Sequence, residues 1–471
     1  MAAMSTASVI GSGPNGLAAA IVLAQAGLKV DVYEAEAQPG GGARTMPLTL
    51  PGFQHDFGSA VHPLAIGSPF FSTLPLKQYE LLWLHSQSAV AHPFDDGTAI
   101  TLQRDLENTL RNLGEDRKQW QSLFEPFAKN WQAFVEEILG PVIHRPRHPL
   151  LYMRFGLKAM QSAQSFAQGR FNNARTRALF AGLAAHSGQS LTSSFSAAVG
   201  IMFAASVHAV GWPIPKGGAQ SITNALIAYL EFLGGTVHTS RRITTLSELP
   251  DTLTLCDLPP QQLVRIASDR LSPQYQQSVS NFRPGPGSFK IDYALSQHIP
   301  WQAGDCYQSA TIHVGGTFEE IVASEQAAAQ GRTPDRPFII LTQPSLFDPS
   351  RAPAGKHTAW AYCHVPNGST VDMTERIEDQ IERFAPGFRR AILARRVFTP
   401  ADLEAADANL MGGDVAGGAM TLRQILFRPG PDQYATSNPN IYLCSASTPP
   451  GAGVHGMCGY HAAKLALSSH K

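Results

Sequence analysis

A glycine motif near the start of the chain constrains the fold of its first part. A short apolar stretch ending at Ile10 is followed by Gly-Ser-Gly-Pro-Asn-Gly, with glycines at 11, 13 and 16, and then by an alanine-rich helical stretch. A second β-rich stretch ends at Glu34, 23 residues after Gly11. This order of strand, glycine turn, helix, strand and acidic residue is typical of a Rossmann-type dinucleotide-binding domain.

Each conspicuous residue of the motif has a physical role. Gly11 permits the tight turn, Gly13 lets the backbone approach a pyrophosphate, and Gly16 lets the helix pack close to the strand. The first turn of the helix offers unpaired N–H groups and a partial positive charge to the phosphates. Glu34 can accept hydrogen bonds from ribose hydroxyls and would repel a 2′-phosphate, which disfavours NADP. The alternative interpretation is a glycine turn without a ligand.

The spacing of the motif does not by itself distinguish NAD from FAD, but two further stretches help. Residues 38–44 read Gln-Pro-Gly-Gly-Gly-Ala-Arg, which suits a second backbone approach to a pyrophosphate with Arg44 as a cationic clamp. Residues 445–459 place glycines between a strand and a closing helix, and such a loop can lie against a flat ligand. The helix that follows can stabilise the negative charge of a reduced flavin. A solvated arginine and a flexible surface loop are the alternative interpretations.

The composition restricts the class of protein. The 471 residues are enough for two large domains, and 44% apolar residues is a globular composition. Lys plus Arg and Asp plus Glu number 36 each, which argues against a nucleic-acid binder. The five cysteines include no CxxC pair, so we predict neither a disulfide framework nor a metal site. We see no secretory signal and no spanning stretch, and expect a cytoplasmic protein, at most peripheral to a membrane.

The middle of the chain has helical and strand-like patterns. Residues 284–365 alternate short β-like runs with turns, which predicts a sheet in a second domain. Five aromatic residues share one helical face and, with the apolar stretch 197–210, either line a substrate cavity or form ordinary core. These aromatics are Trp120, Phe124, Phe127, Trp131 and Phe134. Arginines at 389, 390, 395 and 396 form either a solvated face or a contact with an anionic membrane.

Four stretches carry a resemblance to a known family. They are GSGPNGLAAAIVLAQAG, PGGGARTMPLTLPGFQHDFGSAVHPLA, WPIPKGGAQSITNAL and YLCSASTPPGAGVHGMCGYHAA. Together they resemble the phytoene desaturase-like, FAD-dependent oxidoreductases, and within them the branch related to pyridine nucleotide-disulphide oxidoreductase domain-containing protein 2. Since there is no CxxC pair, the disulfide chemistry in that name is not supported.

The resemblance implies an α/β fold of two domains, as in monoamine oxidases and phytoene desaturases. A discontinuous Rossmann-type FAD-binding domain is joined to a substrate domain with a mixed β-sheet and helices. We assign residues 1–75, 211–260 and 432–471 to the FAD-binding domain, and residues 76–210 and 261–431 to the substrate domain.

The resemblance also implies non-covalently bound FAD and a set of residues around it. The predicted cofactor contacts are Gly11, Gly13, Pro14, Asn15, Gly16, Glu34, Ala35, Gly42, Ala43, Arg44, Ala60, Val61, Arg242, Ile243, Ser447, Gly453, Val454, Gly456 and Met457. Of these, Arg242 and Ile243 would contact the adenine. His62 and His455 are predicted near the flavin as catalytic residues that donate a proton or hold the charge of a reduced flavin. The alternative for both is a hydrogen-bonded structural histidine.

The activity implied by the resemblance is that of a flavin-dependent dehydrogenase or desaturase. It would remove hydride from C–H bonds of an apolar substrate, isoprenoid or acyl. A flavin-containing isomerase, an amine oxidase and an interaction protein with structural FAD remain alternatives, because a fold does not fix a function. The expected partners are an apolar small molecule and a membrane surface in peripheral contact. The sequence does not determine the substrate, the electron acceptor or the oligomeric state.

Overall fold

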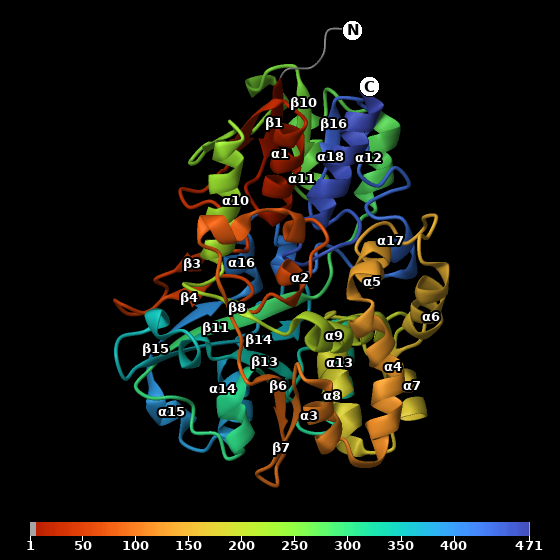
Figure 1. The fold of residues 1–471 in the computed structure, drawn as a ribbon. Coiled ribbons are helices and arrows are strands. Elements are labelled where there is room, and N and C mark those ends of the chain that lie inside the picture. The colour runs from red at the N-terminus through yellow and green to blue at the C-terminus, as the bar shows by residue number, and fades with distance from the viewer. Residues whose placement is uncertain (1–5, 471) are drawn as a thin grey trace.

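The computed structural model describes residues 6–470, which form two parts, each built around one sheet (Figure 1). The first sheet has five parallel strands in the order β16-β10-β1-β2-β9. These strands are β1 (Thr6–Ile10), β2 (Lys29–Tyr33), β9 (Thr236–His238), β10 (Leu253–Cys256) and β16 (Ile441–Leu443). Because they come from three distant stretches of the chain, the predicted discontinuous Rossmann-type arrangement is confirmed.

Helices cover both faces of the first sheet. One face carries α1 (Pro14–Gln25), α10 (Gln220–Phe232) and α18 (Met457–Ser469), and the other carries α11 (Pro260–Ala267) and α12 (Pro273–Ser280). Side chains of β1 alternate between these layers, since Val9 packs with the first group and Ile10 with the second. Leu263 and Val279 complete the core around Ile10, so α11 and α12, which follow the predicted boundary at residue 260, pack on the first sheet.

Helix α1 is buried from Asn15 to Ala24, between the sheet and α18. It begins at Pro14, where the missing N–H of proline removes no helical hydrogen bond. Gly459 allows α18 to approach closely, because an added Cβ there would lie 1.8 Å from the Asn15 carbonyl oxygen. The two glycine-rich stretches at opposite ends of the sequence therefore meet in one place.

The second sheet has seven strands in the order β15-β11-β14-β13-β12-β6-β7. It is mixed, as predicted, because β12 pairs with β6 in parallel while the other neighbours are antiparallel. Its strands are β6 (Ser88–Pro93), β7 (Ala99–Leu102), β11 (Gly287–Leu295), β12 (Ser309–Val314), β13 (Ile339–Thr342), β14 (His357–Val365) and β15 (Ile392–Phe398). Two short pairs join β3 (Thr45–Met46) to β4 (His55–Asp56) and β5 (Trp83–Leu84) to β8 (Ile214–Pro215).

Helices also cover the second sheet, and a further stack of helices lies beside it (Figure 1). One face of the sheet packs on α14 (Thr374–Phe384) and α15 (Phe388–Ala391), and the opposite face turns toward α8 (Ala174–Ala185), α9 (Ala197–Val210) and α13 (Phe318–Ala329). The remaining helices are α2 (Pro63–Ile66), α3 (Leu106–Asn112), α4 (Arg117–Lys129), α5 (Trp131–Ile138), α6 (Pro149–Ala159), α7 (Ala163–Arg170), α16 (Pro400–Ala406) and α17 (Leu422–Leu426). Within residues 6–470, none of the helices has the length and apolar character needed to span a bilayer.

The aromatic face predicted between residues 120 and 134 is ordinary core. Trp120, Phe124 and Phe127 lie on α4, and Trp131 and Phe134 on α5, and all five are buried. They stack on one another and on further aromatics of the helical stack, such as the pair formed by Phe127 and Phe134 at 4.6 Å between ring centroids. This aromatic layer therefore holds the helices together and does not reach a ligand site.

Candidate active site

A continuous cavity of about 570 Å³ lies between the two parts of the chain. Its walls are the glycine turn after β1, the ends of β2 and β10, the loop after β16, and one face of strands β11 and β14. The predicted site residues that line it are Gly11, Gly13, Pro14, Asn15, Glu34, Ala35, Gly42, Ala43, Arg44, Arg242, Ile243, Ser447, Gly453, Val454 and His455. Stretches from both ends and from the middle of the sequence thus share one ligand-sized space.

Other predicted residues lie behind the wall rather than on it. They are Gly16, Ala60, Val61, His62, Gly456 and Met457, none of which lines the cavity. A Cβ added to Gly16 would lie 2.1 Å from the Gly11 carbonyl oxygen, so this glycine permits the close turn from outside. Gly456 has φ 70° and faces the ring of Phe71, where a Cβ would lie 2.4 Å away. Both glycines therefore shape the wall, and their contact with the cofactor stays a prediction.

Glu34 is fixed at the end of β2. One carboxylate oxygen accepts hydrogen bonds from the backbone N–H of Ser12 at 3.0 Å and from its hydroxyl at 2.5 Å. The other accepts from the backbone N–H of Glu36 at 2.9 Å. The side chain is buried and the residue lines the cavity, so a carboxylate with a set orientation is available to a ribose.

Two buried arginines line the cavity and suit an anionic ligand. Arg44 donates to the carbonyl oxygens of Gly41 at 2.7 Å and Ala406 at 2.9 Å, and its guanidinium lies 4.6 Å from the ring centroid of Phe57. Arg428 donates to the carbonyl oxygen of Gly417 at 2.7 Å, and its Nε has no partner among the described residues. Both guanidiniums donate hydrogen bonds to neutral groups and form no ion pair within 4.0 Å among the described residues, although the Asp407 and Asp414 carboxyl groups lie near Arg44 and Arg428, respectively. Each can therefore also donate to an anion. The residues present therefore fit the pyrophosphate of FAD.

Asp257 lies directly beneath the glycine turn. Its Oδ2 accepts a hydrogen bond from the backbone N–H of Gly16 at 2.9 Å and lies 2.9 Å from where a Cβ on Gly13 would be. Burial raises the pKa of Asp257 to about 7; the hydrogen bond from Gly16 opposes this, and the nearby Asp407 and Glu34 raise it further. A carboxyl group that is half protonated near neutrality thus borders the expected phosphate position.

We expect the affinity for FAD to fall as the pH rises through about 7. Loss of the Asp257 proton adds a negative charge next to the pyrophosphate, and the repulsion is expected to weaken binding about tenfold. Asp257→Asn keeps the shape of the side chain and should remove this dependence. The dissociation constant can be measured from the quenching of FAD fluorescence across the pH range. Asp269→Asn, at an exposed position outside the cavity, is the matched control, and an unchanged pH profile in Asp257→Asn would contradict the prediction.

The face of the second sheet supplies a polar and aromatic wall. In the antiparallel register of β11 and β14, Ser288 lies opposite His364, and Lys290 opposite Tyr362. These four residues and Trp360 line the cavity. Burial lowers the pKa of Lys290, and contact with the Asp292 carboxylate partly offsets this lowering. The side chains of Lys290, His364, Ser288 and Tyr362 therefore bring a cation, an imidazole and two hydroxyls to the cavity.

His364 is oriented by a buried carboxylate. Its Nδ1 forms a hydrogen bond with Glu325 Oε2 at 2.8 Å. Its Nε2 faces Gly188 and lies 3.5 Å from the position that a Cβ on Gly188 would take. Burial alone would lower the pKa of His364, but Glu325 raises it above the usual value. Nearby, His186 lines the cavity and its Nε2 lies 2.9 Å from Nε2 of His313.

Sequence reasoning missed this wall, although a signal was present. Polar residues occur at alternate positions, 288, 290 and 292, in a strand that is otherwise apolar, and polar or aromatic residues do so at 360, 362 and 364. Since side chains alternate across a strand, each set shares one face. Only the packing of β11 beside β14 brings the two sets together.

The two predicted catalytic histidines occupy different environments. His455 lines the cavity, and its Nδ1 accepts a hydrogen bond from the backbone N–H of Met457 at 3.0 Å. His62 lies outside the wall, with Nδ1 3.3 Å from the Ser59 hydroxyl. Burial lowers the pKa of each to about 4, so both are neutral at pH 7. The bond from Met457 shows that His455 orders the loop at the start of α18, and its role as a proton donor stays a prediction.

Another part of the cavity wall is apolar. Val199, Met202 and Phe203 project from α9, and Ile138 and Leu139 from the end of α5. Part of the predicted apolar stretch 197–210 therefore does line the cavity. All five cysteines are free and buried, and burial raises the pKa of Cys458 to about 12, which makes its thiol unreactive at neutral pH.

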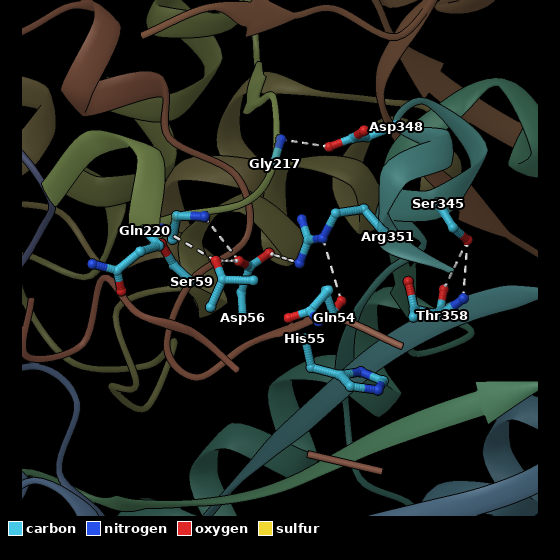
Figure 2. A network of polar contacts seen from close by, with 12 residues as sticks. Gln54, His55, Asp56, Ser59, Gly217, Gln220, Ser345, Asp348, Arg351 and Thr358 are labelled. Atoms are coloured by element: carbon cyan, nitrogen blue, oxygen red, sulfur yellow. Dashed lines mark hydrogen bonds and ion pairs between the residues drawn. The ribbon is translucent and has the colours of Figure 1, made fainter. Parts of the chain in front are cut away.

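A buried network fixes the floor of the cavity (Figure 2). Asp56 accepts hydrogen bonds from the Thr45 hydroxyl at 2.7 Å and the Ala219 N–H at 2.8 Å, and its other oxygen pairs with Arg351 at 2.8 Å. Arg351 also donates to the carbonyl oxygen of Gln54 at 3.3 Å. Since residues 57–59 line the cavity, this network places them by tying β4 to the start of α10 and to the second part of the chain.

Comparisons with known proteins agree with this geometry. A family model described as an NAD(P)-binding Rossmann-like domain matches residues 9–70. The pyridine nucleotide-disulfide oxidoreductase domain-containing protein 2 of Rattus norvegicus is 26% identical, over 99% of this chain and 94% of that protein. The phytoene desaturase (lycopene-forming) of Pseudescherichia vulneris is 24% identical, over 95% and 96% of the two chains. The structure of an engineered putrescine oxidase matches with a TM-score of 0.63 at 14% identity, over 99% of each chain.

These similarities run through both parts of the chain. The curated relatives match nearly from end to end, although the family model covers only the first glycine turn and the segment after it. The structural match confirms the predicted two-domain α/β fold.

Proposed function

We propose that this chain, which is similar over nearly its whole length to curated phytoene desaturases and related proteins, is an FAD-dependent oxidoreductase that acts as a dehydrogenase or desaturase of a mainly apolar substrate. The substrate would be isoprenoid or acyl. The observation that carries the proposal is the cavity, which extends from the glycine turn to the apolar wall formed by Val199, Met202 and Phe203.

The residues of the chain bind, orient and shield the reactants. FAD held there would supply a hydride acceptor for a substrate C–H bond, and a desaturation would also release one proton from the neighbouring carbon. The Gly11–Gly13 turn and Arg44 hold the pyrophosphate, and the apolar wall on α9 excludes water from the reacting carbon. Lys290, Tyr362 and His364 supply hydrogen-bond donors that fix a polar group of the substrate.

An amine oxidase is the second candidate, and it too rests on a specific observation. The rings of Trp360 and Tyr362 lie 5.1 Å apart between centroids, inclined at 66°, and both residues line the cavity. Aromatic faces of this kind attract cations, and since Lys290 Nζ already lies 5.7 Å from the Trp360 ring centroid, an amine substrate would rely on the Tyr362 ring. The substrates tested must therefore include both apolar polyene or acyl compounds and amines.

The test is to mix the FAD-loaded protein with each candidate substrate in the absence of oxygen and to record the loss of flavin absorbance. Polyenes and long-chain acyl compounds form one panel, and aliphatic amines form the other. We expect bleaching with the first panel, and expect Met202→Trp, which fills the apolar wall, to slow it at least tenfold while FAD content is kept. Leu393→Trp, at an exposed site on β15, is the matched control.

Two outcomes would contradict the proposal. Bleaching by amines alone would favour the second candidate. Equal rates in Met202→Trp and the unchanged protein would show that the apolar wall does not hold the substrate.

A further inference from the structure

Helix α6 exposes an apolar stripe to solvent. Leu150, Met153, Leu157 and Met160 are 77%, 56%, 60% and 50% exposed. Their spacings of three, four and three residues put them on one side of the helix. A surface helix normally turns such a stripe toward the core, and a large exposed apolar patch marks an interaction site. We call these four residues the α6 stripe.

The loop before α6 adds two more exposed apolar side chains. Val142 and Ile143 are 39% and 59% exposed. The Tyr152 hydroxyl donates to the Val142 carbonyl oxygen at 2.5 Å, which ties the loop to α6. The buried carboxylate of Glu137 accepts from the backbone N–H groups of residues 147 and 148 at 2.8 and 2.7 Å. The loop is therefore held in place beside the helix by hydrogen bonds.

The loop at 142–148 and α6 carry only basic charged residues. Although the whole chain has equal numbers of acidic and basic residues, no aspartate or glutamate occurs from residue 138 to residue 230. Arg145, Arg147, Arg154 and Lys158 are the Lys and Arg residues of the loop and α6, and the three arginines are exposed. One weak ion pair reaches this group, from Arg147 to Glu136 at 3.8 Å. The surface therefore combines apolar side chains with uncompensated cations.

The arginines at 389–396 differ in this respect. Arg389 pairs with Glu375, Glu378 and Asp379, and Arg395 pairs with Glu378. The charges of these two arginines are neutralised within the protein, whereas Arg390 and Arg396 have no ion pair among the described residues. A membrane contact of this cluster stays a prediction.

We propose that the α6 stripe and the loop at 142–148 dock on an anionic lipid surface. Apolar side chains of a helix lying in the interface enter the boundary between head groups and acyl chains, while lysine and arginine pair with anionic head groups. A symmetric contact with a second copy of the chain would place the same cations against each other, which disfavours it. The chemistry of the patch matches a lipid phosphate with an apolar layer beneath it.

The position of α6 links this surface to the cavity. Figure 1 shows α6 at the outer edge of the helical stack, away from both sheets. α6 packs against α5 and α9, and α9 carries the apolar wall of the cavity on Val199, Met202 and Phe203. Docking through α6 would therefore place the membrane beside the helix that lines the cavity.

Flotation of the FAD-loaded, full-length protein with lipid vesicles tests the proposal. One set of vesicles is phosphatidylcholine alone, and the other is equimolar phosphatidylcholine and phosphatidylglycerol. We expect binding to the anionic vesicles, weakened by added salt. Leu150→Ser with Leu157→Ser should reduce the bound fraction about tenfold or more, and Arg145→Gln with Arg147→Gln should reduce it for anionic vesicles. Phe232→Ser, which changes a residue 75% exposed on α10, is the matched control.

Unchanged FAD content and melting temperature verify that each variant is folded. The proposal is overturned if the unchanged protein stays unbound with both kinds of vesicle, or if the serine variant binds as well as the Phe232→Ser control. It is also overturned if the unchanged protein is a dimer in solution and the serine variant is a monomer, because the stripe would then be an interface between two copies.

Discussion

Gly16→Ala is expected to weaken FAD binding by about tenfold to a hundredfold. The added Cβ would lie 2.1 Å from the Gly11 carbonyl oxygen and 3.3 Å from Cβ of Asp257. The first of these atoms belongs to the backbone, so the clash cannot be relieved by rotating a side chain. The turn itself must move, and Gly11 and Gly13, which approach the phosphates, move with it.

The dissociation constant for FAD and the FAD content of the purified protein measure this effect. Gly169→Ala on α7 is the matched control, because it adds the same methyl group where no heavy atom lies within 4 Å. Thermal unfolding of FAD-free protein separates a damaged site from a damaged fold. An affinity for FAD equal to that of the control would show that the turn is not the phosphate site.

Arg351→Met is expected to lower the free energy of unfolding by about 3–5 kcal/mol. Arg351 and Asp56 are each 1% exposed, and the substitution leaves the Asp56 carboxylate buried without its cation. The remaining hydrogen bonds from Thr45 and Ala219 compensate only part of its lost hydration. Because the pair joins the two parts of the chain, unfolding should also become less cooperative.

The stability lost in Arg351→Met should be greater at neutral pH than at acid pH. Burial alone would raise the pKa of Asp56, but Arg351 and three hydrogen bonds lower it below its ordinary value of 3.8. A carboxyl group whose pKa is lower in the folded than in the unfolded protein stabilises the fold at pH values above its pKa in the unfolded protein. This stabilisation disappears as the pH falls through its pKa in the folded protein. The difference between Arg351→Met and the unchanged protein should therefore be largest at neutral pH and shrink toward acid.

Urea unfolding at several pH values measures both effects. Arg117→Met is the matched control, because its pair with Glu107 is about half exposed and such pairs contribute about 1 kcal/mol or less. The double variant Asp56→Asn with Arg351→Met should recover a large part of the loss, since it leaves no buried charge. A loss from Arg351→Met no greater than that from Arg117→Met would refute this account of the network.

The local part of the dinucleotide site could be predicted from the sequence. The strand ending at Ile10, the turn containing Gly11 and Gly13, and Glu34 lie within a short stretch, and each has a strong conformational or chemical preference. Local signals of this kind depend little on the rest of the fold. The closing helix after the glycine loop was predicted for the same reason, and it begins at Met457.

The polar wall of the cavity shows why the rest required the tertiary structure. Lys290 and Tyr362 lie side by side only because β11 and β14 pair in one register, and a slip of one strand by one residue would turn one of the two side chains to the opposite face. Asp257 reaches the glycine turn from 241 positions away along the chain. Pairings over such distances depend on the free energy of the whole fold and leave no local pattern.

The sequence by itself determined that the cofactor is a dinucleotide and which turn approaches its phosphates, because glycine spacing and backbone N–H groups act over a few residues. It also determined the apolar periodicity of the helices. Only the tertiary structure decided which apolar faces are covered: the face carrying Trp120 and Phe124 is buried, while the face carrying Leu150 and Leu157 is exposed. The physical reason is that periodicity fixes which residues share a face, whereas burial depends on which neighbour packs against it.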